Sequence, residues 1–187
     1  MTAKITAEPD WAARNAALGT TVEELTVPGI TPEELFATYG VPYYLKIDIE
    51  GADLLLLRGL GKVAGRPQYV SIESDDGSLA TVRDEFAVLE DLGYGQFKLS
   101  PQHEVPQQKV PAGSPHGKAL DHAFEWDASG LVGEDLPGPW LSAREALARS
   151  EGPLILSNLS KAIHAGQLTG DHEGFLMKHG YGPVTQW

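Results

Sequence analysis

Three ionisable side chains alternate with apolar ones between residues 43 and 53 of this chain. If the segment is an extended strand, its two-residue repeat places Lys46, Asp48 and Glu50 on one face and three aliphatic side chains on the other. Charged side chains on a strand of a buried sheet need an ionic partner, contact with water or a role in function, because burying an ionised group without a partner is unfavourable. The pattern therefore predicts either an internal ion pair or a set of groups that bind and act on a ligand.

The residues after this strand predict where such a ligand would lie. Gly51 interrupts the extended pattern, and the apolar segment 52–60 opens as a helix with Asp53 in its first turn. Open parallel α/β sheets bind ligands at the carboxyl ends of their strands, where the chain turns into the next helix. The alternative is structural: Lys46 neutralises the acids, and Glu50 or Asp53 stabilises the helix N-terminus.

A second acidic turn follows the predicted strand 68–73. Its residues Glu73 and Asp75 would lie in the same crevice, and we expect them to bind substrate. Two other interpretations stay open. The carboxylates of Glu73, Asp75 and Asp76 can hold a divalent metal together with Asp48, because hard cations prefer carboxylate oxygens. They can also stabilise the helix that begins near Ser78, where negative charge is favoured.

The surrounding pattern predicts the elements that position these groups. Thr31, Pro32 and Glu34 form a helix start with a capping box, and Gly40 ends that helix. The expected elements are a strand at 20–27, a helix at 31–39, a strand at 43–49, a helix at 52–60, a strand at 68–73, a helix at 78–93 and a strand at 96–99. This alternation predicts an α/β fold with a mostly parallel sheet.

The character of the chain changes after residue 100. Residues 101–115 hold four prolines and three glutamines, which predicts an irregular surface loop. A capping box at Ser142 and Glu145 predicts a short helix near Ala148, and residues 158–165 predict another helix. We therefore expect an irregular C-terminal extension with short helices.

Composition limits the partners of the protein. Its 187 residues carry 14 Lys and Arg against 26 Asp and Glu, a formal charge of -12, so we expect neither nucleic-acid nor membrane binding. There is no cysteine, which excludes disulfides, thiolate zinc sites and cysteine nucleophiles. The six histidines lack the spacing of a metal site, so no metal is expected. With no long apolar segment in the sequence, we expect a cytoplasmic protein.

The central motif resembles the signature of a known family. Residues 45–53 (LKIDIEGAD), followed by residues 57–60 (LRGL), resemble the signature of the FkbM-type S-adenosylmethionine-dependent methyltransferases. Five other segments also resemble this family: 39–42, 67–73, 93–94, 97–99 and 133–141. The resemblance covers roughly residues 20 to 141. It implies a Rossmann-like sheet, S-adenosylmethionine as cofactor, and methyl transfer to a hydroxyl oxygen of a small metabolite or saccharide.

The resemblance also implies roles for the charged face. Asp48 would orient the acceptor hydroxyl or contact the amino group of the cofactor. Glu50 would accept a proton or hold the loop, and Lys46 would balance the two acids. These three are the predicted catalytic residues, and no cofactor-binding residue is assigned.

The sequence departs from the family pattern before Thr20. Rossmann-like methyltransferases have a glycine-rich loop after the first strand and an acid after the second, whereas residues 11–19 contain one glycine and no strand precedes them. We therefore expect an incomplete sheet, equivalent to the C-terminal part of the fold, that binds cofactor weakly by itself. The predicted division is an N-terminal segment at 1–19, the C-terminal half of the methyltransferase domain at 20–100, and the irregular extension at 101–187.

Two other functions remain open at this point. An incomplete sheet leaves the strand 43–49 as an exposed edge, which can pair with a second copy of the chain. The protein would then be a non-catalytic remnant or an interaction module. The other alternative is a carboxylate-metal hydrolase built on Asp48, Glu73 and Asp75.

Overall fold

The computed structural model describes residue 19 and residues 26–49, 52–74, 79–116, 121–126 and 128–164. Two compact units divide the chain. The first takes residues up to 75 together with 87–93, and the second takes residues 76–86 and those from 94 onward. Among the described residues, no helix combines the length and apolar character that crossing a membrane requires.

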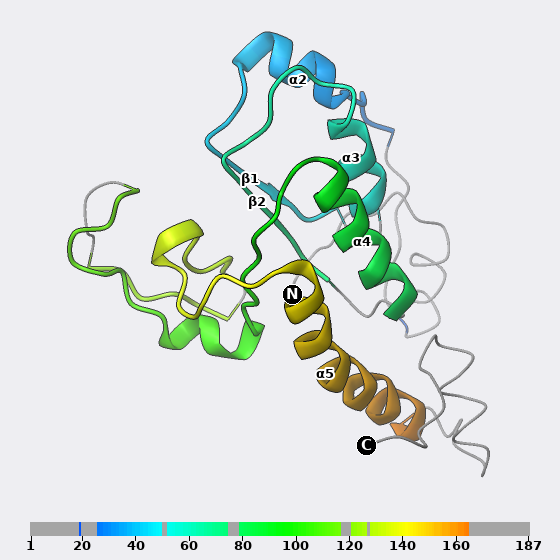
Figure 1. Cartoon of the computed structure of the whole chain (residues 1–187), viewed down its shortest axis with the longest axis vertical. Helices are drawn as coiled ribbons and strands as arrows, with labels where there is room; N and C mark the ends of the chain where they lie inside the picture. Colours follow the sequence, from blue (N-terminus) through cyan, green and yellow to red (C-terminus); the bar gives the residue numbers. More distant parts are fainter. Residues whose placement is uncertain are drawn as a thin grey trace. The chain divides into compact units, whose positions relative to one another are not determined.

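The first unit contains a two-stranded parallel sheet (Figure 1). Strand β1 (Tyr44–Ile47) pairs with strand β2 (Tyr69–Ile72), and helix α3 (Asp53–Leu60) lies between them in the chain. Helix α2 (Pro32–Tyr39) precedes β1 and packs against α3. The predicted strands at 43–49 and 68–73 and the predicted helices at 31–39 and 52–60 are therefore confirmed, with slightly shorter strands.

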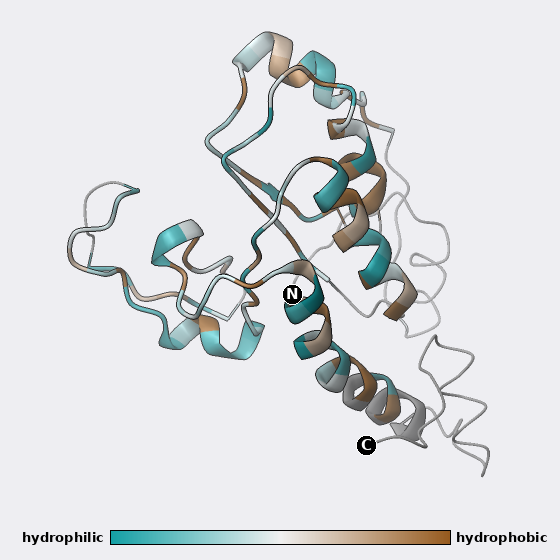
Figure 2. Ribbon diagram, in the orientation of Figure 1, coloured by the Kyte–Doolittle hydropathy of each residue, from teal (hydrophilic) through white to brown (hydrophobic). Residues whose placement is uncertain are grey.

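The core of the first unit forms around α3. Its buried members are Phe36, Ile47, Leu57 and Leu60, and partly buried aliphatic residues from both strands and from the end of α4 (Leu79–Asp91) pack around them. Figure 2 shows apolar residues concentrated on α3 and along the two strands. Burial of this apolar surface is the main force that holds the sheet against its helices.

Helix α2 begins and ends as its sequence predicts. The Thr31 hydroxyl accepts a hydrogen bond from the backbone N–H of Glu34 at 3.2 Å, and the Glu34 carboxylate accepts one from the backbone N–H of Thr31 at 2.9 Å. The bond from the Thr31 backbone and, second, one that the Thr31 hydroxyl donates to the Glu34 carboxylate at 3.0 Å lower the pKa of Glu34. At the other end Gly40 has a φ of +81°, and its N–H donates to the Phe36 carbonyl. The capping box is confirmed.

The end of α4 depends on a glycine and an arginine. Gly93 has a φ of +89°, and its N–H donates to the Glu90 carbonyl at 2.8 Å. The Arg66 guanidinium donates to the Leu92 carbonyl at 2.5 Å, and a Cβ atom at position 93 would overlap this guanidinium. Glycine is therefore required here both by backbone conformation and by space.

One prediction about the sheet differs from the structure, and another falls mostly outside the described residues. The prediction of a further strand at 96–99 is wrong, since Phe97 forms a single antiparallel bridge with Leu141. Phe97 is buried against Phe86, with ring centroids 4.9 Å apart, so packing holds this residue without a strand. Of the strand predicted at 20–27, residues 20–25 lie outside the described residues, and Thr26 and Val27 are not in a strand.

The second unit is more helical than the sequence predicts. The segment expected to be irregular contains the 3₁₀ helix η1 (Gln102–Gln107), whose Val105 is buried, and a second 3₁₀ helix, η2 (Gly133–Asp135), follows. Helix α5 (Ala143–His164) begins at the predicted capping box, so its start is confirmed. Its predicted short length is wrong, because it continues through Pro153 and includes the helix predicted at 158–165 as far as His164. A proline costs one helical hydrogen bond, and apolar residues of α5 packed on the buried Leu79 offset that loss.

One lysine holds the segment around η2. The Lys98 ammonium donates to the carbonyls of Leu136 at 2.6 Å, Gly133 at 3.0 Å and Glu134 at 3.5 Å. The same ammonium lies 4.6 Å from the centre of the Trp140 ring, whose indole N–H donates to the Glu134 carboxylate. The three carbonyls thus take the three N–H donors of the ammonium, and the Trp140 ring adds a cation–π contact.

Replacing this lysine tests its structural importance. Lys98→Met keeps the alkyl stem but removes every hydrogen bond to the carbonyls, so we expect a loss of about 2 kcal/mol in the free energy of unfolding. Urea denaturation followed by tryptophan fluorescence measures the loss. Lys109→Met is the matched control, because Lys109 is exposed, and it should leave the urea midpoint unchanged. Equal midpoints for the two variants would contradict the assigned role.

Candidate functional site

Strand β1 has the alternation that its sequence predicts. Ile47 is buried and Leu45 packs on the core, while Lys46 lies on the opposite face with 38% of its side chain exposed. Ile49 lies two residues beyond the last strand residue and is exposed. Asp48 follows Lys46 by two residues, so the two-residue repeat extends the polar face to Asp48 at the carboxyl end of β1.

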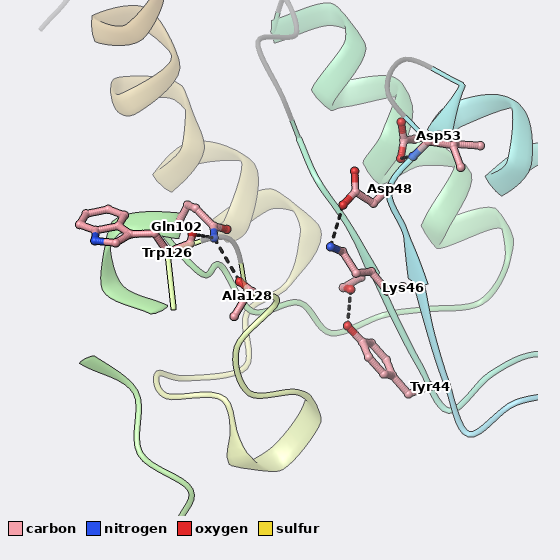
Figure 3. Close-up of polar contacts among 9 residues, drawn as sticks. Tyr44, Lys46, Asp48, Asp53, Gln102, Trp126 and Ala128 are labelled. Atoms are coloured by element: carbon pink, nitrogen blue, oxygen red, sulfur yellow. Dashed lines mark hydrogen bonds and ion pairs between the residues drawn. The ribbon is translucent and has the colours of Figure 1, made fainter. Parts of the chain in front are cut away.

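Lys46 and Asp48 form an ion pair on this face. The Lys46 ammonium donates to the Asp48 carboxylate at 2.7 Å (Figure 3). This hydrogen bond is the main cause that raises the pKa of Lys46, the charges of Asp48, Glu73 and Tyr44 add to the rise, and partial burial opposes it. The structure thus brings three predicted site residues into one electrostatic environment, where the carboxyl ends of β1 and β2 meet.

The two other predicted site residues, Glu50 and Asp75, lie outside the described residues, and their roles stay predictions. Asp53 is described, and its carboxylate accepts a hydrogen bond from the Ile49 backbone N–H at 3.2 Å. The cap position of α3 is Ala52, and this cap makes no side-chain hydrogen bond. Asp53 therefore stabilises the turn between β1 and α3.

A hydroxyl pair on the same face was not predicted from the sequence. The Tyr44 hydroxyl and the Ser71 hydroxyl lie 2.6 Å apart, and both residues are partly buried. Tyr44 is two residues before Lys46, and Ser71 is two residues before Glu73, so the two-residue repeat alone assigns both to the polar face. Their contact could not be predicted, because it depends on the register between β1 and β2.

The described pocket does not involve these residues. It has a volume of about 150 Å³, lies in the second unit, and is lined by Leu99, Ser100, Pro101, Glu104, Gln107, Gln108, Leu136 and Pro137. In the part of the chain that the structure describes, no group of three or more His, Asp or Glu side chains could hold a metal ion. One residue of the alternative metal site, Asp75, is outside that part.

The raised pKa of Lys46 predicts how the ion pair depends on pH. A group whose pKa is higher in the folded protein stabilises the fold below its unfolded pKa, here the ordinary lysine value of 10.5, and this stabilisation is lost as the pH rises through the folded value. We therefore expect the difference in unfolding free energy between the wild type and Lys46→Met to be constant around neutral pH and to shrink above the ordinary lysine pKa. Because both side chains of the pair are about a third exposed, the difference should stay below about 1 kcal/mol.

Urea denaturation at a series of pH values measures this difference. Lys62→Met is the matched control in the same unit, because Lys62 is exposed, and it should show no such pH dependence. A difference that grows at alkaline pH would contradict the assigned ion pair.

Comparison with known proteins gives one match. No curated protein and no solved structure matches the chain. The family described as the methyltransferase FkbM domain matches residues 2–95, just over half of the chain. This stretch contains β1, β2 and the Lys46–Asp48 pair, and the match confirms the family indicated by the motif at 45–53. The chain therefore belongs to the FkbM methyltransferase domain family.

Proposed function

We propose that this protein is an S-adenosylmethionine-dependent O-methyltransferase that acts on a hydroxyl of a small metabolite or saccharide. Membership of the FkbM family indicates a methyltransferase in general. The observation that carries the finer proposal is the Lys46–Asp48 ion pair at the carboxyl end of β1, within reach of the charge of Glu73. A Rossmann-like arrangement of the whole sheet, with ligands at the carboxyl ends of the strands, is part of the same proposal.

The chemistry of the described side chains fits this cofactor. S-adenosylmethionine presents a sulfonium, an ammonium group and two ribose hydroxyls, which are all groups that carboxylates bind. The polar face offers the carboxylates of Asp48 and Glu73 against the single ammonium of Lys46, so it favours a cationic ligand. Glu73 would hold the amino group or a ribose hydroxyl with one carboxylate oxygen, which leaves Asp48 for the acceptor. When bound, the cofactor supplies an electrophilic methyl group.

Side chains of this protein orient and activate the hydroxyl of the acceptor substrate. Asp48 accepts a hydrogen bond from the acceptor hydroxyl and takes its proton, which makes the oxygen a better nucleophile. Lys46 balances the charge of Asp48 and orients its carboxylate through the 2.7 Å hydrogen bond. Glu73 accepts hydrogen bonds from other substrate hydroxyls. The predicted roles of Glu50 in proton transfer and of Asp75 in substrate binding belong to the same proposal.

Transfer of a labelled methyl group tests the function. The purified chain is incubated with methyl-tritiated S-adenosylmethionine and a panel of monosaccharides, methyl glycosides and hydroxylated metabolites, and mass spectrometry identifies the methylated atom. We expect a methyl ether as product. A parallel calorimetric titration with the cofactor tests the expectation of weak binding. Methylation at nitrogen or carbon would contradict the hydroxyl acceptor, and absence of both binding and transfer would end the proposal.

The predicted partners and location are tested separately. Sedimentation velocity decides whether copies associate, as the predicted exposed edge of β1 requires. Fractionation of cells that express the full chain tests the predicted cytoplasmic location. Neither result bears on the assignment of Asp48.

A further inference from the structure

The hydroxyl pair Tyr44–Ser71 crosses the sheet on a diagonal. In the register of the two strands Tyr44 lies opposite Tyr69, and Ser71 lies opposite Lys46. The 2.6 Å contact therefore joins Tyr44 to the residue that faces Lys46, two positions further toward the carboxyl ends. Aromatic side chains are long enough to reach such a diagonal neighbour.

This diagonal contact limits the space around Lys46. The Tyr44 side chain must lean along the polar face to reach Ser71, so its ring lies on the side of Lys46 that faces β2. The hydroxyl pair therefore occupies the β2 side of the lysine side chain, while its outer side stays open to solvent, since 38% of the side chain is exposed. Figure 3 shows Lys46 between Tyr44 and Asp48, with its ammonium turned toward Asp48.

The ion pair needs such a restriction. Lys46 and Asp48 are two residues apart on one strand, a Cα separation of about 6.6 Å, so both side chains must bend toward each other to reach 2.7 Å. A lysine side chain with four rotatable bonds loses entropy when it holds one direction. A hydroxyl pair that excludes the β2 side in advance reduces that loss. Tyr44 is also among the groups that raise the pKa of Lys46, which agrees with its closeness to the ammonium.

We propose that Tyr44 and Ser71 are positioning residues of the methyl-transfer site. Their hydroxyl pair confines the Lys46 side chain, so that its ammonium holds the Asp48 carboxylate in the orientation that receives the proton of the acceptor. Neither hydroxyl contacts the reacting atoms. The inference rests on the proposed function, because the orientation matters only if Asp48 acts on an acceptor.

Four single substitutions separate positioning from general stability. Tyr44→Phe and Ser71→Ala each remove one hydroxyl of the pair, and Ser71→Ala leaves the phenol of Tyr44 in place. Ser71→Thr keeps a hydroxyl and serves as the conservative rescue. Tyr39→Phe is the matched control, because Tyr39 is 79% exposed at the end of α2.

The first measurement needs no activity. A pH titration of the Lys46 side-chain carbon resonances by NMR, assigned with Lys46→Met, gives its pKa in each protein. We expect Tyr44→Phe and Ser71→Ala to lower that pKa toward the ordinary lysine value. Ser71→Thr should restore it, and Tyr39→Phe should leave it unchanged. A fall in Ser71→Ala is decisive, since it cannot come from loss of the phenol.

The second measurement is the rate of methyl transfer. We expect the same two variants to lower kcat about tenfold, with KM values within about twofold of the wild type, because misplacing a reacting group affects the chemical step more than binding. Ser71→Thr should recover most of the rate.

The outcomes distinguish this inference from the proposed function. If both variants behave like Tyr39→Phe in the titration or in kcat, the positioning role is wrong. Loss of unfolding free energy without a change in either readout would also overturn it, since the pair would then be structural only. If the wild type itself transfers no methyl group, the proposed function fails, and the NMR titration alone decides whether the pair positions Lys46.

Discussion

Asp48→Asn should lower the single-turnover rate of methyl transfer by about 10²- to 10⁴-fold, the usual contribution of a positioned proton acceptor. Asparagine has the size of aspartate but cannot take a proton, and it removes the charge that the Lys46 ammonium contacts at 2.7 Å. Binding of the acceptor should change less than the rate. Rapid-quench measurement with tritiated cofactor at saturating concentrations gives the rate of the chemical step.

The control for this prediction is Asp91→Asn. Asp91 is an exposed residue at the end of α4, and the last turn of this helix belongs to the same unit as Asp48. This variant receives the same chemical change and should keep the wild-type rate. Because a partly exposed ion pair contributes little to stability, Asp48→Asn should also keep its unfolding free energy within about 1 kcal/mol. A folded Asp48→Asn protein with a rate within threefold of the wild type would show that Asp48 is not the proton acceptor.

Leu57→Ala should cost about 2–5 kcal/mol of unfolding free energy, because it removes three carbon atoms from a completely buried position of the first unit. Leu57 is completely buried among Phe36, Ile47 and Leu60. The neighbouring strands cannot collapse fully into the vacated volume without breaking their ladder. Urea denaturation followed by far-UV circular dichroism measures the loss.

The control lies on the other side of the same helix. Leu55 is 74% exposed, so Leu55→Ala should change the unfolding free energy by no more than about 0.5 kcal/mol. Hydrogen exchange at the backbone amides of β1 and β2 then shows whether the loss belongs to the first unit, where Leu57→Ala should speed exchange and Leu55→Ala should not. Similar losses for both variants would mean that the core assigned around α3 is wrong.

Local patterns predicted the elements that carry the candidate site. The capping box of Thr31 and Glu34 involves residues three positions apart, so the sequence alone specifies the start of α2. The alternation through Lys46 and Ile47 likewise follows from the two-residue repeat of a strand. The same repeat placed Lys46 and Asp48 on one face, and their contact needs no other part of the chain.

Other features depended on partners far along the chain. The sequence near Phe97 suggested a strand, but its bridge partner is Leu141, and local hydropathy does not indicate which distant segment will pair. Helix α5 passes through Pro153 because apolar residues of that helix pack on Leu79, a contact that outweighs the local signal of the proline. The environment of Lys98 likewise needs carbonyls more than thirty residues away.

The sequence by itself thus determined the limits of α2 and α3, the alternation of β1 and the family, since each depends on residues that are close together in the chain. Only the tertiary structure decided the register that sets Ser71 opposite Lys46. From that register follow the Tyr44–Ser71 hydroxyl pair and the approach of Glu73 to the ion pair. The physical reason is that two separate strands can pair in several registers with similar backbone hydrogen bonds, and side-chain packing across the whole unit selects one of them.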